Sequence, residues 1–188
     1  MRIVLDGRDV DRIMSPQTVK DAVRSVLSSQ EAIEAPRASL ERHDSWMGLM
    51  AAAGMGLHAV KIVGVYPGNP TRGLPLVRGV LLALRSDSGD IILEAPAEEA
   101  TGWRTAGASA LALELMGYDG GGILGVIGSG VQARYHLRVL AGLYDLDGVI
   151  VYSRNRRRAE RLASQYGGVY RPLDYLLSES TVIVAATN

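Results

Sequence analysis

The chain has 188 residues, of which 20 are basic and 20 acidic, so its formal net charge at pH 7 is zero. This balance argues against a surface for nucleic acid or anionic lipid, and no apolar run reaches the length of a membrane span. The absence of cysteine and the presence of only three histidines argue against disulfides and against thiolate or histidine metal sites. We therefore expect a soluble, cytoplasmic protein with a small-molecule partner and without metal, nucleic acid or membrane.

The first hundred residues predict an α+β unit with an antiparallel sheet. Ser15-Pro16 is typical of a helix start, and Asp87-Ser88-Gly89-Asp90 is typical of a hairpin turn. We expect helices from Asp6 or Gly7 to Met14 and from Pro16 to about Ser28, a strand or turn over 46–53, and strands over 38–40, 57–66, 79–84 and 91–93. A further helix, from about 102 to 116, carries the predicted domain boundary, with residues 1–105 in the first domain and 106–188 in the second.

Lys61 is unusual in a chain that has 18 arginines and only one other lysine, Lys20. It lies inside an apolar segment, and on a strand it would share a face with Ala59, Val63 and Val65. A lysine in this position either extends to solvent at the rim of a sheet or is held in a pocket where it exchanges protons. We regard Lys61 as a candidate catalytic residue.

A glycine-rich sequence opens the second part of the chain. The apolar run 123–127 reads as a buried parallel strand, and Gly128-Ser129-Gly130-Val131-Gln132-Ala133 matches G-x-G-x-x-G/A. A helix over about 131–143 and a second strand over 148–152 follow. Such glycines let a pyrophosphate approach main-chain N–H groups at a helix N-terminus, whereas a Cβ would block it. We predict a dinucleotide site that includes Gly128, Ser129, Gly130, Val131 and Gln132; the alternative is a glycine-rich turn in another α/β unit.

The residues after the second strand indicate which dinucleotide is bound. NAD sites place an acidic residue about 20 positions after the glycines to accept from the ribose 2′-hydroxyl. Here no carboxylate lies between Asp147 and Glu160, and Ser153, Arg154 and Asn155 follow the strand instead. A hydroxyl and a guanidinium are able to hold a 2′-phosphate. We therefore predict NADP rather than NAD, with Arg154 as the specific contact; the alternative for 156–158 is a solvated, basic start to the next helix.

The rest of the chain continues the parallel sheet. We expect a helix over 156–166, a short strand at 169–170, a helix over 173–177 and a fourth strand over 181–185. Ala186 and Thr187 follow this strand, and we assign them to the cofactor site. Because a doubly wound sheet needs about six strands, only its first half is expected here. The predicted fold class is α/β: an α+β domain followed by an incomplete Rossmann domain, in a truncated product or a chain completed by a partner.

Several separate segments together resemble the ornithine cyclodeaminase/mu-crystallin family. The resemblance rests on Lys61, on the glycine loop 128–132, and on the segments Pro67-Gly68-Asn69-Pro70, Arg72-Gly73-Leu74-Pro75 and Trp103-Arg104-Thr105. It implies a substrate-binding and dimerisation domain, a Rossmann domain and an active site between them. It also implies a homodimer acting on a small amino or imino acid.

The resemblance further implies roles for three side chains. Arg37 and Arg104 would bind the substrate carboxylate, and Lys61 would lie beside the reacting carbon, holding the carboxylate or moving a proton. Read from residue type alone, the two arginines would instead form surface ion pairs.

Two departures from the family pattern shape the functional prediction. Leu76 stands where ornithine cyclodeaminases have a threonine that helps hold substrate, and the catalytic aspartate of the family belongs to a part of the Rossmann domain beyond this sequence. The sequence therefore favours an NADPH-dependent reductase of a small cyclic imino acid, of the pyrroline-2-carboxylate or ketimine type. The alternatives are an ornithine cyclodeaminase-type lyase, an amino-acid dehydrogenase such as an alanine dehydrogenase, and a non-catalytic ligand-binding protein like mu-crystallin.

Overall fold

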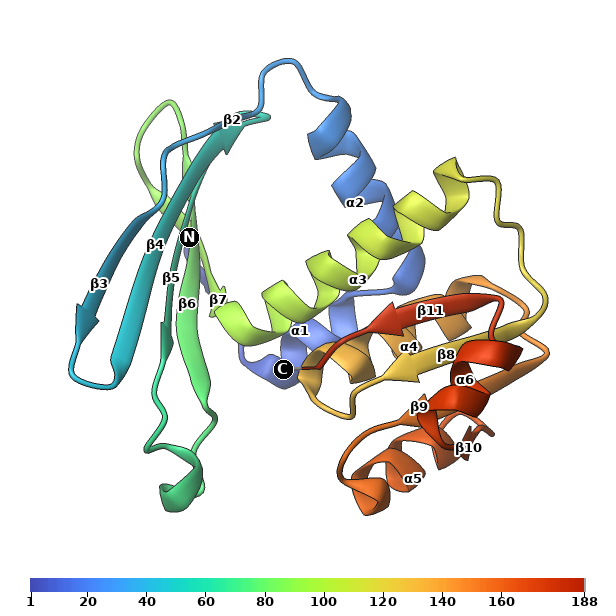
Figure 1. The fold of residues 1–188 in the computed structure, drawn as a ribbon. Helices are drawn as coiled ribbons and strands as arrows, with labels where there is room; N and C mark the ends of the chain where they lie inside the picture. The colour runs from blue at the N-terminus through green and yellow to red at the C-terminus, as the bar shows by residue number, and fades with distance from the viewer. Residues whose placement is uncertain (188) are drawn as a thin grey trace. The chain divides into compact units, whose positions relative to one another are not determined.

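The computed structural model describes residues 1–187, which divide into two compact units (Figure 1). The first unit contains Met1–Met14 and Arg24–Thr101, and the second contains Ser15–Val23 and the chain from Gly102 onward. The predicted boundary after residue 105 lies within the helix α3 (Ala97–Leu115), and the division falls slightly earlier in the same helix. The sequence did not predict that residues 15–23 join the second unit. The assignment of the two units to substrate and cofactor stays a prediction.

A sheet of seven strands within the described residues forms most of the first unit, in the order β1-β7-β6-β5-β4-β2, with β3 also pairing with β4. The strands from β4 to β7 form an antiparallel meander, as predicted, and β1 runs parallel to β7. Their bounds are β1 (Ile3–Val4), β2 (Ile33–Glu34), β3 (Ala38–Arg42), β4 (Ser45–Gly54), β5 (Leu57–Val65), β6 (Val77–Arg85) and β7 (Ile91–Pro96). The two-residue strands β1 and β2 were not predicted, because two residues carry no periodicity and only their partner strands define them.

Local hydrogen bonds explain the ends of several elements of this unit. The carboxylate of Asp6 accepts from the amide of Asp9 at 2.8 Å and caps α1 (Gly7–Ile13), while the amide of Asp6 donates to the Asp9 side chain. After β5, the buried Asn69 donates from its side-chain amide to the carbonyl of Pro75 at 2.8 Å, and the short 3₁₀ helix η1 (Pro70–Arg72) follows it. This hydrogen bond closes the loop between β5 and β6.

Two long helices supply packing for the second unit. Val19 of α2 (Pro16–Ser28) packs against Gly107 of α3, and Lys20 forms an ion pair with Glu114 at 2.6 Å. The helix α3 begins at Ala97, five residues before the predicted start at 102. Its first turn carries two acidic residues, which interact favourably with the positive end of the helix dipole.

The second unit contains a parallel sheet in the order β10-β9-β8-β11, which corresponds to strands 3-2-1-4 of a doubly wound fold. Its elements are β8 (Ile123–Ile127), α4 (Val131–Leu143), β9 (Gly148–Tyr152), α5 (Arg156–Ser164), β10 (Val169–Tyr170), α6 (Leu173–Glu179) and β11 (Val182–Ala185). Fully buried aliphatic side chains on the strands and helices form the core. The α/β prediction for this part is therefore confirmed. Among residues 1–187, no helix is both long and apolar enough to cross a membrane.

Candidate functional site

The glycine loop lies where the carboxyl ends of three parallel strands meet. The amide of Gly128 donates to the carbonyl of Tyr152 at the end of β9, and the amide of Ala186 donates to the carbonyl of Ile127 at the end of β8, both at 2.7 Å. At Gly128 the backbone has φ 122°, and an added Cβ would collide with the carbonyl oxygen of Ala186. Gly128 is therefore required because the loop passes so close to the chain after β11.

Glycine is favoured at position 130 for a different reason than at position 128. Its φ of −89° and ψ of −166° suit any residue, and an added Cβ would meet no heavy atom within 4 Å. The open space lies at the N-terminus of α4, whose first turn carries no acidic residue. The first helical hydrogen bond runs from the amide of Arg134 to the carbonyl of Gly130, so the earlier amides of the helix are available to an anion. This geometry fits the pyrophosphate of a dinucleotide.

Ala133 and Gln132 complete the glycine motif, and each has a distinct environment. Ala133, at the third motif position, is completely buried, which lets the helix approach the strand. Within the described residues, the side-chain oxygen of Gln132 is buried without a hydrogen-bond partner. An unsatisfied buried acceptor in this position suits a ligand that carries an N–H or O–H donor.

A buried histidine, which sequence reasoning missed, holds the first turn of α4 in place. His136 Nδ1 lies 2.8 Å from the carbonyl of Gln132, and Nε2 lies 3.0 Å from the hydroxyl of Ser109 on α3. Because a carbonyl only accepts, Nδ1 donates the proton of its contact with Gln132. A helical i, i+4 relation between Gln132 and His136 is the only sequence signal of this contact.

Two serines join the glycine loop to the end of β9. The hydroxyls of Ser129 and Ser153 are 2.9 Å apart, and Ser153 donates to the carbonyl of Asn155 at 2.9 Å. Ser129 is therefore the donor of the pair. The side-chain oxygen of Asn155 accepts from the amide of Arg158 and caps α5. The segment predicted to hold a 2′-phosphate thus lies directly beside the loop.

The acidic residues that flank this segment are engaged elsewhere. Asp147, at the opposite end of β9, accepts from the amide of Gly122 at 2.7 Å. Glu160 pairs with Arg156 at 2.7 Å, and the Arg156 guanidinium also lies 5.1 Å from the centre of the Tyr170 ring. Hydrogen bonding to Glu160 raises the pKa of Arg156. Asp147 therefore lies at the wrong end of β9 to accept from a ribose hydroxyl at the loop, and Glu160 is already paired.

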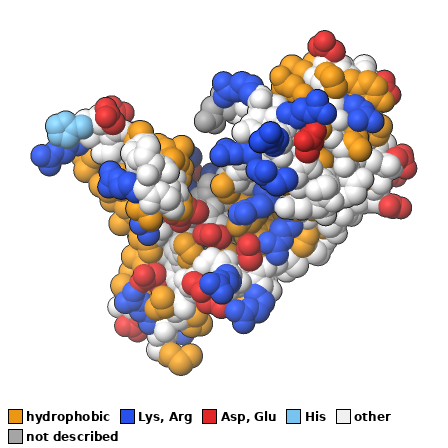
Figure 2. Space-filling view, turned by 90° about the horizontal axis from the view of Figure 1, so that it is seen from below, with side chains coloured by type: hydrophobic (Ala, Val, Ile, Leu, Met, Phe, Trp, Pro, Cys, Tyr) orange, Lys and Arg blue, Asp and Glu red, His pale blue; other side chains and the backbone are white. Residues whose placement is uncertain are grey.

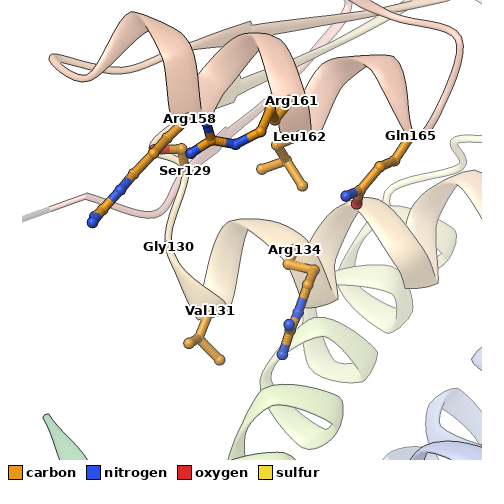
Figure 3. Close-up of a pocket in the computed structure, with 8 residues that line it drawn as sticks. All are labelled: Ser129, Gly130, Val131, Arg134, Arg158, Arg161, Leu162 and Gln165. Atoms are coloured by element: carbon orange, nitrogen blue, oxygen red, sulfur yellow. The ribbon is translucent and has the colours of Figure 1, made fainter. Parts of the chain in front are cut away.

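A hollow of about 360 Å³ borders the loop on the side of α5 (Figure 3). It is lined by Ser129, Gly130, Val131, Arg134, Arg158, Arg161, Leu162 and Gln165. Sequence reasoning missed Arg134 and Arg161, and it gave Arg158 only as part of a solvated helix start; Arg154 is exposed and does not line the hollow. Figure 2, which views the molecule from the side where α5 lies in Figure 1, shows many basic side chains on this surface.

The structure therefore brings the predicted cofactor residues to one edge of one sheet. Gly128 to Gln132 follow β8, Ser153 to Asn155 follow β9, and Ala186 and Thr187 follow β11. In open α/β sheets, ligands bind outside the carboxyl ends of the strands. Their roles as cofactor contacts stay a prediction. Across residues 1–187, no group of three or more acidic or histidine side chains is arranged to hold a metal ion.

The residues predicted to bind substrate are divided between the two units. Lys61 is half-buried in the middle of the central strand β5, opposite Met50 and Leu81, and its Nζ lies 3.5 Å from the hydroxyl of Thr101. It is therefore not at the rim of the sheet. Arg37, in the first unit, is exposed and lies 3.6 Å from Glu34, whereas Arg104 is exposed on α3 in the second unit. That Arg37, Lys61 and Arg104 share one substrate site stays a prediction.

Known proteins share both the sequence pattern and the fold. A sequence model of the ornithine cyclodeaminase/mu-crystallin family matches residues 4–185. The iminosuccinate reductase of Paracoccus denitrificans is 25% identical over 198 aligned positions, which cover 99% of this chain and 62% of that protein. The chain thus spans less than two thirds of the length of this relative.

Two solved structures are similar along nearly the whole chain. The Δ(1)-pyrroline-2-carboxylate reductase of Thermococcus litoralis, solved with NADH and L-proline, superposes with a TM-score of 0.87 at 24% identity, covering 98% of this chain and 62% of that one. An archaeal alanine dehydrogenase dimer with bound NAD superposes with a TM-score of 0.86 at 25% identity, covering 99% and 60%. The first likeness shows the fold, and both confirm the predicted fold class.

Proposed function

Because the chain belongs to the ornithine cyclodeaminase/mu-crystallin family, we propose that it is the substrate-binding and first cofactor-binding part of an NADPH-dependent reductase of a small cyclic imino acid. The observation that carries the proposal is the glycine loop beside an acid-free strand end, with open space at Gly130 and Ser129 bonded to Ser153. The substrate class follows the relatives, which include an iminosuccinate reductase and pyrroline-2-carboxylate reductases.

The choice of NADP rests on this chain's own residues. The related structures contain NADH or NAD, which supports a nicotinamide cofactor. They do not determine whether this chain binds NADP or NAD. A ribose 2′-hydroxyl needs an acceptor, and both nearby carboxylates are engaged elsewhere. A 2′-phosphate needs donors, and the guanidinium of Arg154 follows the end of β9.

The proposed reaction assigns one task to each predicted substrate residue. When bound, the reduced nicotinamide supplies a hydride from its C4 to the imine carbon. Arg37 and Arg104 bind the carboxylate and so orient the carbon–nitrogen double bond. Lys61 donates a proton to the imine nitrogen, or holds it protonated, while Thr101 keeps the ammonium in position. We further propose a homodimer, as the related alanine dehydrogenase forms.

The test is NADPH oxidation followed at 340 nm with pyrroline-2-carboxylate, using the complete protein. Net oxidation of NADPH supports the reductase. Release of ammonia from ornithine without net cofactor change would identify a cyclodeaminase instead, and oxidation of alanine would identify a dehydrogenase. Tight binding of cofactor without turnover of any of these substrates would identify a binding protein. Size-exclusion chromatography with light scattering tests the dimer.

A further inference from the structure

One face of α5 presents two arginines to the hollow beside the glycine loop. Arg158, Arg161, Leu162 and Gln165 are spaced i, i+3, i+4 and i+7, which places them on the same side of a helix. Leu162 is buried and anchors this face, while both arginines are exposed. In Figure 3 the Arg161 side chain runs along α5 towards Ser129, and Arg158 extends from the same helix. The hollow therefore has two guanidinium groups on its α5 wall.

The charge in the hollow is not balanced by protein groups. None of its eight lining residues is acidic, and Arg134 adds a third positive charge from α4. Within residues 1–187, neither Arg158 nor Arg161 forms an ion pair. The other wall is the loop itself and the N-terminus of α4, which carries partial positive charge. A hollow built in this way attracts an anion.

The position of the hollow identifies the anion. Ser129, Gly130 and Val131 belong both to the hollow and to the loop that fits a pyrophosphate. In a dinucleotide, the adenosine 2′-position is one ribose away from the pyrophosphate, so a group on it reaches a space that borders the loop. We propose that this hollow is the binding site of the cofactor's 2′-phosphate, and that Arg158 and Arg161 bind it. The proposal rests on the proposed use of NADP. It adds two specificity-determining residues inside the hollow to Arg154, which follows β9 and lies outside the hollow.

The neighbouring arginines of α5 show that this arrangement is specific to one face. Arg156 is held by Glu160 and by the ring of Tyr170, and it does not line the hollow. Arg157 is exposed and does not line it either. Arg157 therefore provides a matched control, because its replacement removes the same charge from the same helix.

The experiment measures binding of adenosine 2′-monophosphate and adenosine 5′-monophosphate to the complete protein by calorimetry. Four proteins are compared: wild type, Arg158→Ala, Arg161→Ala and Arg157→Ala. We expect the wild type to bind the 2′-phosphate compound more tightly, and each of the two hollow variants to weaken this binding about tenfold, as loss of a charge-assisted hydrogen bond requires. Binding of the 5′ compound should change less than threefold in these variants, and Arg157→Ala should behave like wild type.

The proposal would be overturned by equal wild-type affinities for the two compounds, by unchanged binding in both hollow variants, or by an equal loss in Arg157→Ala. All three substitutions are of exposed helix residues, and circular dichroism verifies that the variants are folded. These probes carry no nicotinamide and need no turnover. If the protein binds the 2′ compound as expected but oxidises no NADPH, the phosphate-binding site is supported and only the proposed reaction is contradicted.

Discussion

Replacing the two glycines of the loop by alanine should separate binding from stability. Gly130→Ala should mainly weaken binding, whereas Gly128→Ala should lower stability. At Gly130 the backbone suits alanine and the added methyl group meets open space. Restricting the unfolded chain contributes about 0.4–1 kcal/mol, and the poorer helix cap costs a similar amount, so stability should change by less than about 1 kcal/mol. For a chain of this length, that is a shift in Tm of at most about 4 °C.

Binding of the dinucleotide should respond strongly to the same change. The methyl group of Gly130→Ala occupies the space that the pyrophosphate needs against the first amides of α4. Loss of two charge-assisted hydrogen bonds at about 1.5 kcal/mol each raises the Kd about 100-fold. Quenching of protein fluorescence by NADPH measures the Kd, and differential scanning calorimetry measures Tm.

Gly128→Ala is the contrasting variant. Its φ of 122° disfavours alanine, and the added Cβ collides with the carbonyl oxygen of Ala186, so backbone strain of about 1–3 kcal/mol is the least expected loss of stability. A folded Gly130→Ala protein that binds NADPH within threefold of wild type would refute the assignment of this loop to the pyrophosphate. A large fall in the Tm of Gly130→Ala would refute the description of the space at Gly130 as open.

Three further predictions concern other parts of the chain. Arg154→Ala should weaken NADP binding about tenfold more than NAD binding, because only NADP carries the 2′-phosphate; equal losses measured by calorimetry would contradict the assignment. Lys61→Met should lower kcat at least about 100-fold and leave the Kd for NADPH unchanged, since a proton donor acts in the transition state; an unchanged kcat would exclude it from proton transfer. The amide of Asp9 lowers the pKa of the Asp6 carboxyl below 3.8. A depressed folded pKa stabilises the protein above pH 3.8, and this contribution is lost as the pH falls through the folded value. Asp6→Ala should therefore lower Tm at pH 7 and have a diminishing effect below pH 3.8; an equal loss of Tm at pH 2.5 would contradict the capping role.

The loop and its flanking elements could be predicted because their signals are local. A five-residue apolar run, two glycines and a helical pattern specify strand, turn and helix within one stretch of chain, and the structure has β8 and α4 at these positions. The parallel order of the sheet followed from the same alternation of strands and helices. The roles of Arg37 and Arg104 came from family resemblance alone, whereas Lys61 was also singled out by its place in an apolar segment. All three roles await experiment.

Features that depend on distant partners were missed. The strands β1 and β2 exist because β7 and β4 offer them hydrogen bonds. Residues 15–23 join the second unit because Val19 packs on Gly107, nearly ninety positions later. No local pattern reports contacts of this kind.

The arginine-rich segment after β9 shows which properties are set by the sequence and which by the tertiary structure. The sequence by itself determined that the end of β9 carries no carboxylate and several guanidinium groups, because charge is a property of residue type. Only the tertiary structure decided which arginines border the glycine loop. Helical rotation turns Arg158 and Arg161 to the hollow, and the pairing of Arg156 with Glu160 and Tyr170 holds that side chain elsewhere. The helix period and the packing of α5 against β9 and β10 set these directions, and both are established only when the chain folds.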